Sequence, residues 1–364
     1  MQAKITRIAN IVIITTLSVA ALYFAAPLLI PIVLAALLAM LLVTVSNRLE
    51  KMGIGRALAS LIPILLFVCT IVLLGLILSW QINRLAEDFA ETRAVITARI
   101  DSIREWISDT FGIHLDVQKK MLQEQEKEAS TWAGSLFFSF INAVSSLAIN
   151  AVLVIIYTYL LIFYRSHLKT FILHVVPKDK KQQADTIIHK SVTISGRYLI
   201  GLFNMVAVLW VMYSIGFTLV GLEGAIFFAI ICGILEIVPF FGNFVGNLIA
   251  IFSVLAQGGD GRMVLGIVFV YLTVQFLQTY ILEPLVVGQQ VNINPLFTIM
   301  ALVAGELLWG IAGMALAIPV IGIVKIICDH IPALQPWGVL IGPAKAKRDK
   351  TSLLRFLGKR HRSR

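Results

Sequence analysis

Long runs without a charged residue dominate this sequence and limit what it can fold into. They lie between Arg7 and Arg48 and at Ala57–Ser79, Ser130–Tyr164 and Leu199–Val220. Each run reaches or exceeds the length of about 20 residues that an α-helix needs to cross a bilayer. A soluble fold could not bury so much apolar surface, since only 14% of the residues are charged. We therefore predict an all-α integral membrane protein, a multi-pass helical bundle.

Positive charges gather in the segments between these runs and predict how the chain is oriented. The basic segments are the N-terminus, Arg48–Arg56, Arg165–Arg197 and the tail Lys345–Arg364. Because loops rich in Lys and Arg resist translocation, we expect these segments and both termini on the cytoplasmic side. We interpret the formal net charge of +10 as an orientation signal and a source of contact with anionic lipid headgroups, and expect no nucleic-acid partner.

Two segments outside the apolar runs have helical patterns of their own. Residues 81–131 carry seven Lys and Arg against ten Asp and Glu, with apolar residues every three or four positions, which predicts an extracytoplasmic amphipathic helical hairpin. Within Arg165–Arg197, the pattern after Pro177 predicts an amphipathic helix on the membrane surface, followed by a crossing. In the first run, Pro27 and Pro31 predict a tight turn between two crossings. The predicted divisions are N-terminal transmembrane helices (1–80), the acidic hairpin (81–131), a crossing with the surface helix (132–198), a C-terminal core (199–328) and a basic cytoplasmic tail (329–364).

Two apolar blocks in this core, 224–256 and 295–328, have lengths that do not suit simple crossings. At roughly 33 residues each, they are long for one crossing and short for two with a turn. If both are re-entrant hairpins, a single crossing by Met263–Leu282 returns the chain to the cytoplasm and gives an inverted repeat, whose tips would form a binding site. The alternative is that each block is one long, kinked spanning helix. The residues that would break the helices are Pro239, Gly242, Gly305 and Gly310.

Three carboxylates fall in or beside these blocks. An ionised side chain at the centre of a membrane costs at least about 2.5–3.5 kcal/mol. Glu236, three residues before Pro239, is expected to be a proton or cation site, or else to hydrogen-bond the free backbone at the break. Glu306 at the second tip and Glu283 at the end of the crossing are further candidates. Neutral side chains that could bind a polar solute, or only join neighbouring helices, are Asn243, Asn247, Gln275 and Gln278, with Gln275, Gln278 and Thr279 on one helical face.

The sequence carries no signature of an enzyme. It has no HExxH, GxSxG or P-loop motif. Its three cysteines, Cys69, Cys232 and Cys328, stand singly in apolar runs without CxxC spacing. We therefore expect no enzymatic activity, no cofactor and no metal site.

Five stretches of the chain resemble the autoinducer-2 exporter family of bacterial membrane transporters. They are Pro27–Pro31, Leu49–Ala59, Leu235–Gly242, Leu282–Gly288 followed by Asn294-Pro295, and Gly305–Pro319. The resemblance implies a multi-pass protein of the bacterial inner membrane without ATPase machinery, in a homo-oligomer for which a pentamer is one option. Members of the family have been linked to export of autoinducer-2, and others to sodium/proton exchange. This chain departs from the family at Glu306, where a small or neutral residue is expected.

Three functions remain open on this basis. The leading hypothesis is a secondary transporter that exports a small polar metabolite similar to autoinducer-2, down its gradient or coupled to protons at Glu236. The second is a sodium or lithium/proton antiporter that uses Glu236, Glu283 and Glu306. The third is a membrane scaffold, without transport, whose acidic hairpin and basic tail recruit partners. In the first two hypotheses, residues 199–328 are the transport core.

Overall fold

The computed structural model describes residues 2–80, 150–236, 241–256, 259–287 and 293–343, and helices form nearly all of these ranges. No strand occurs within them. Five of their helices are long and apolar enough to cross a membrane, or six if one bent pair forms a single span. The predicted all-α multi-pass fold is therefore confirmed. The segment predicted as an acidic hairpin, the break residue Pro239 and the chain from residue 344 onward lie outside the described residues.

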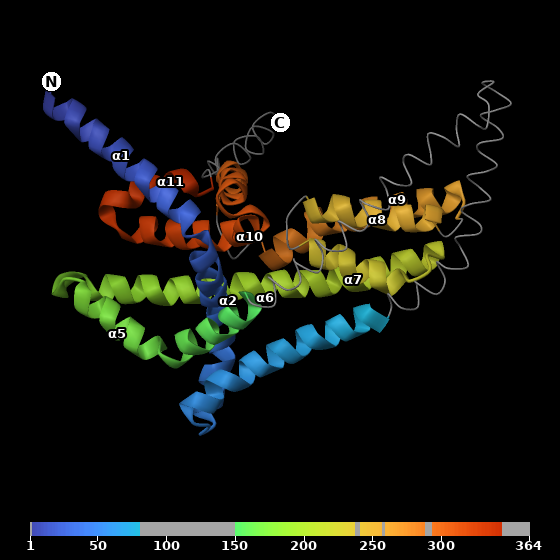
Figure 1. Cartoon of the computed structure of the whole chain (residues 1–364), viewed down its shortest axis with the longest axis horizontal. Helices are drawn as coiled ribbons and strands as arrows, with labels where there is room; N and C mark the ends of the chain where they lie inside the picture. Colours follow the sequence, from blue (N-terminus) through green and yellow to red (C-terminus); the bar gives the residue numbers. More distant parts are fainter. Residues whose placement is uncertain (1, 81–149, 237–240, 257–258, 288–292, 344–364) are drawn as a thin grey trace, which may run out of the picture.

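One long helix, α6 (Lys181–Val220), organises the molecule (Figure 1). Its 40 residues extend for about 60 Å, twice the thickness of the hydrocarbon core of a bilayer. The charged residues of α6 all precede Tyr198, and the 23 residues from Tyr198 to Val220 carry no charge. The helix ends at Gly221, whose φ of 84° is a left-handed conformation that glycine adopts without steric cost. The helices α2 (Ala26–Lys51), α7 (Ala225–Leu235), α9 (Gly261–Leu277) and α10 (Pro295–His330) all pack against α6.

The helix predicted on the membrane surface is not separate from the crossing that follows it. α5 (Arg165–Val175) is a short helix of its own, bent by 67° from the preceding helix Asn150–Phe163. It ends because Pro177 favours an extended conformation at Val176 (φ −80°, ψ 136°). After the turn η1 (Lys178–Lys180), the basic residues up to Arg197 form the first half of α6. The helix is continuous across residue 198, where a division was predicted.

The turn predicted at Pro27 and Pro31 is wrong. α1 (Gln2–Phe24) runs on into α2 with a bend at Ala25, as Figure 1 shows. Helical hydrogen bonds continue through this junction, since the amides of Ala25 and Leu29 each donate at 2.9 Å to the carbonyl four residues earlier. Pro27 is accommodated because the first turn of a helix needs no amide donor, so it marks a helix start and not a reversal.

The remaining N-terminal helices pack on α2. They are Arg56–Trp80 and Asn150–Phe163, which share a buried apolar cluster with α2. Its buried members are Ala39, Leu42, Ile64 and Ile162. A close approach also joins α2 to α6, because a Cβ on Gly196 would lie 2.8 Å from the Met40 carbonyl oxygen. These contacts hold α2 against the two other N-terminal helices and against α6.

The first C-terminal block, 224–256, folds back on itself. Its two arms, α7 and α8 (Phe241–Ala256), pack against each other. A Cβ on Gly246 in α8 would come within 2.8 Å of the Cys232 Sγ in α7, so the glycine permits the close approach. Gly242, predicted as a break residue, already lies in the first turn of α8.

The second block, 295–328, is also a hairpin. α10 is interrupted at Trp309 and Gly310, and Gly310 has a φ of 58° that favours glycine. The backbones of Gly305 and Gly313 touch, although residues eight apart in a straight helix are separated by about 12 Å. The alternative of single kinked helices is therefore wrong for both blocks. Their depth in the bilayer, and hence their re-entrance, stays a prediction.

The segment between the hairpins contains an uncommon type of helix. α9 begins at Asp260, whose carboxylate accepts hydrogen bonds from the amides of Arg262 and Met263 at 3.1 Å. It passes directly into η2 (Gln278–Val287), a ten-residue π-helix, which is a rare element that often occurs at functional sites. After α10, the chain ends its described part with η3 (Pro332–Leu334) and α11 (Gln335–Ile341), which pack against α10.

Replacing Gly313 by alanine should destabilise the second hairpin, because the added Cβ would overlap the Gly305 backbone. We expect a loss of about 1–3 kcal/mol, the range for overpacked interiors. Gly75→Ala is the matched control, since Gly75 lies in a helix with open space around it. Thermal unfolding in detergent, followed by intrinsic fluorescence, should give a lower midpoint for Gly313→Ala only. Equal midpoints for the two variants would contradict the hairpin packing.

Candidate functional site

Glu236 lies at the C-terminal end of α7, and only 6% of its surface is exposed. Gln278, the first residue of η2, donates a hydrogen bond from its Nε2 to the Glu236 Oε1 over 2.5 Å. Gln278 is itself 1% exposed. This residue pair thus joins the C-terminal end of α7 to the point where α9 passes into the π-helix η2. The hydrogen bond connects the first hairpin to the predicted crossing helix.

Two other helices complete this buried polar cluster. Tyr213 in α6 hydrogen-bonds the side chain of Asn247 in α8, and both are buried. Cys232 in α7 is buried in the same apolar cluster as Tyr213. Apolar side chains enclose the cluster, including Phe217, Ala229, Val254 and Ile267. We call Glu236, Gln278, Asn247 and Tyr213 the Glu236 cluster.

The first hairpin, η2 and the apolar half of α6, which form the Glu236 cluster, contain no basic residue that could neutralise the Glu236 carboxyl group. No Lys, Arg or His occurs in the sequence at 198–256 or at 263–324, which include the second half of α6, the first hairpin and η2. Burying an ionised carboxylate without a counter-charge is unfavourable, so such a group binds a proton or a cation instead. The other members of the cluster offer hydroxyl and amide groups, which suit either partner. The arrangement can therefore hold a proton or a small cation.

Three of the predicted site residues come together here: Glu236, Asn247 and Gln278. Gln275 donates from its Nε2 to the Thr279 hydroxyl at 3.1 Å, and both residues are less buried than Gln278. Of the predicted shared face, Gln278 is thus the member that is fully buried. Glu306 is exposed on the first arm of α10. The side chains of Glu283 and Asn243 lie outside the described part of the structure.

Tyr213 was not among the predicted site residues. Its signal in the sequence is weak, because a tyrosine in an apolar crossing is also common at a membrane interface. Only the packing of α6 against the first hairpin shows that this hydroxyl faces Asn247. The sequence therefore offers no signal that separates Tyr213 from the neighbouring hydroxyl residues Ser214 and Thr218.

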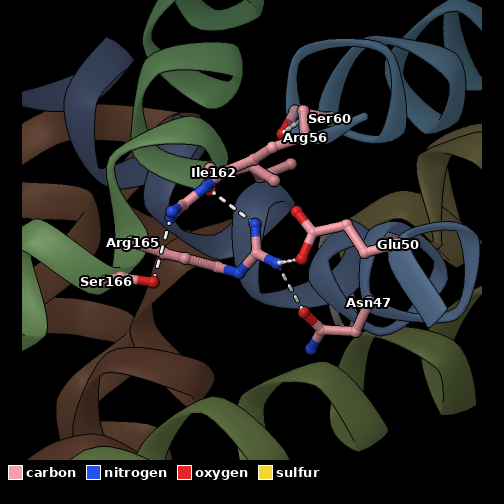
Figure 2. A network of polar contacts seen from close by, with 7 residues as sticks. All are labelled: Asn47, Glu50, Arg56, Ser60, Ile162, Arg165 and Ser166. Atoms are coloured by element: carbon pink, nitrogen blue, oxygen red, sulfur yellow. Dashed lines mark hydrogen bonds and ion pairs between the residues drawn. The ribbon is translucent and has the colours of Figure 1, made fainter. Parts of the chain in front are cut away.

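A second polar network joins the N-terminal helices and was also not predicted. Figure 2 shows Arg165, at the bend before α5, donating to Glu50 at 2.5 Å, to Asn47 at 2.8 Å and to the Ile162 carbonyl at 3.0 Å. Arg56 extends the network by donating to the Ser166 hydroxyl at 3.0 Å. These bonds tie the end of α2 to the 67° bend. The network therefore positions these helices relative to one another.

The fold and the Glu236 cluster together define a class of protein. Apolar helices are long enough to span a membrane, two helical hairpins supply interrupted segments, and a buried carboxyl lies at the end of one hairpin arm. This combination is typical of membrane transport proteins.

The chain belongs to the AI-2E transporter family, whose model, described as "AI-2E family transporter", matches residues 12–333. The chain is 26% identical over 308 residues to YrrI of Bacillus subtilis (strain 168), with 83% of this chain and 86% of YrrI covered. It is 24% identical over 326 residues to PerM of Escherichia coli (strain K12), with 85% and 89% covered. Their names propose a transport protein for YrrI and a permease for PerM. The resemblance to this family is thereby confirmed.

Replacing Gln278 by leucine should destabilise the protein, because it removes the hydrogen bond to the buried Glu236 carboxyl. Leaving a buried polar group without its partner costs about 1–3 kcal/mol. Gln275→Leu is the matched control, since Gln275 bonds Thr279 on the outer side of the same helix and should lose less. Chemical denaturation in detergent measures both changes. A loss for Gln275→Leu as large as that for Gln278→Leu would contradict the special position of Gln278.

Proposed function

We propose that this protein exports a small polar solute, similar to autoinducer-2, across the bacterial inner membrane and couples the export to protons at Glu236. Membrane transport itself follows from the family. One observation supports the finer proposal, namely a carboxyl group buried between α7 and η2 with no basic residue in the first hairpin, in η2 or in the apolar half of α6. A group in this environment is neutral when it holds a proton and costly when it does not. Its protonation can therefore be linked to movement of the helices around it.

The hydrogen bond from Gln278 supplies a route for that coupling. A carboxylate accepts a hydrogen bond more strongly than a protonated carboxyl does. Loss of the proton would therefore tighten the contact between the first hairpin and η2, and also draw water toward the charge. Binding of a proton would weaken this contact and let the hairpin separate from η2. We propose that the two hairpins move in this way relative to the rest of the bundle.

Sodium or lithium/proton exchange is the second candidate, and the composition of the cluster favours it. Oxygen atoms of Glu236, Asn247, Tyr213 and Gln278 are the type of ligand that hard cations prefer. A bound Na⁺ would neutralise the Glu236 carboxyl as a proton does. In either case we place both termini in the cytoplasm and propose a homo-oligomer, a pentamer among the options.

Transport by protein reconstituted in liposomes tests the proton site. We expect Glu236→Gln, which keeps the shape and removes the titratable group, to reduce proton flux at least tenfold. Glu223→Gln is the control, because Glu223 is an exposed carboxylate at the turn between α6 and α7. A pH-sensitive dye inside the liposomes reports proton movement, started by a gradient of autoinducer-2 or of Na⁺. Proton flux driven by the solute alone favours export, and flux driven by Na⁺ favours the antiporter. Unchanged flux in Glu236→Gln would overturn the proton site, and no flux from wild-type protein would favour the scaffold.

A further inference from the structure

Two cavities lie on either side of the basic half of α6, far along this helix from the Glu236 cluster. The larger, of about 780 Å³, lies between α2, α5 and α6. The smaller, of about 390 Å³, lies between α6 and the second arm of α10. His189, Thr193 and Arg197 line both cavities. These three residues of α6 therefore form a wall shared by the two cavities, and this shared wall is polar.

The larger cavity has an apolar wall and a cationic edge. The wall is formed by side chains of α2, of α6 and of the end of the helix Asn150–Phe163. Among them are Ala36, Met40, Val43, Leu161 and Val192. The edge carries four basic side chains, those of Arg165, Lys169, His189 and Arg197. No acidic residue lines this cavity. Such a lining matches a ligand that combines an apolar chain with an anionic group.

Only some of these basic groups are already paired. Arg165 bonds Glu50, and Lys169 forms an ion pair with Asp185 at 2.6 Å. By contrast, Arg197 forms no hydrogen bond or ion pair with any residue that the structure describes, and its side chain is exposed. The guanidinium of Arg197 is thus available to an anion, and guanidinium groups bind phosphate oxygens through two parallel hydrogen bonds.

Three helices change from charged to apolar at the level of this edge. In α6 the charges end at Arg197, and in α2 they begin at Arg48. The third change is at Arg165, where the chain leaves the apolar helix Asn150–Phe163 and bends into α5. α5 exposes large apolar side chains, with Phe171 63% and Val175 69% exposed, between basic residues, which is typical of a helix in the headgroup region. The cationic edge therefore lies where phospholipid phosphates lie.

We propose that the larger cavity is a binding site for an anionic phospholipid. Its phosphate binds the Arg197 guanidinium beside His189, and one acyl chain lies along the apolar wall between α2 and α6. The lipid would then fill the space between α2 and the basic half of α6, which the protein's own side chains leave open. This site does not depend on the function proposed for Glu236.

Lipid titration of the purified full-length protein in a mild detergent tests the proposal. Phosphatidylglycerol and phosphatidylcholine with the same acyl chains are compared by thermal unfolding and by the lipid retained in native mass spectrometry. We expect phosphatidylglycerol to raise the unfolding midpoint more than phosphatidylcholine and to be retained at one bound lipid per chain. Arg197→Gln should remove this difference. Arg48→Gln, an exposed cation at the end of α2 that lines neither cavity, should preserve it.

Two further experiments distinguish binding of a lipid from binding of a soluble anion, and a specific site from general attraction of anions to the basic protein. Glycerol phosphate without acyl chains should give no stabilisation, and Ala36→Phe, which fills the apolar wall, should reduce retained phosphatidylglycerol at least fivefold. The proposal is overturned if glycerol phosphate alone reproduces the effect, or if phosphatidylcholine stabilises as well as phosphatidylglycerol. The proposal is also overturned if Arg197→Gln and Ala36→Phe both retain as much phosphatidylglycerol as the wild-type protein does.

Discussion

The Glu236 carboxyl is buried against the first hairpin, η2 and the apolar half of α6, and none of these segments carries a basic residue. Such a group must hold a proton or a cation, or gain access to water. Two interruptions in the helices make its environment possible. α7 ends at Glu236, and η2 begins at its partner Gln278. Because these helix ends lie next to an ionisable group, a change in the charge of that group can alter the packing of the helices around it.

α6 connects this site to the opposite end of the molecule. Its apolar half carries Tyr213 into the Glu236 cluster, and its basic half carries Arg197 to the cavities beside α2 and α10. The Arg165 network holds the bend before α5 at the same end (Figure 2). A helix of 40 residues extends well beyond the hydrocarbon core. Movement of the first hairpin against α6 would therefore act on an element that is held at its basic end.

Both hairpins could be predicted from the sequence, because their length and internal breaks do not suit straight spans. Glu236, Asn247 and Gln278 were also predictable, since polar residues in apolar segments are unfavourable unless they have partners. The course of α1 into α2 was not, because a proline marks the first turn of a helix as readily as a reversal. The length of α6 was missed because charges show where a helix leaves the bilayer and not where it ends.

The central claim is that the buried Glu236 carboxyl is neutralised by a proton or a bound cation. Infrared difference spectroscopy of the reconstituted protein measures this state directly, because protonated and ionised carboxyl groups absorb at different frequencies. In buffer without Na⁺ at neutral pH, we predict a protonated carboxyl band that is absent from Glu236→Gln, and that either persists or is lost when Na⁺ is added. A Glu236 carboxyl that is ionised at neutral pH in buffer without Na⁺ would contradict the account.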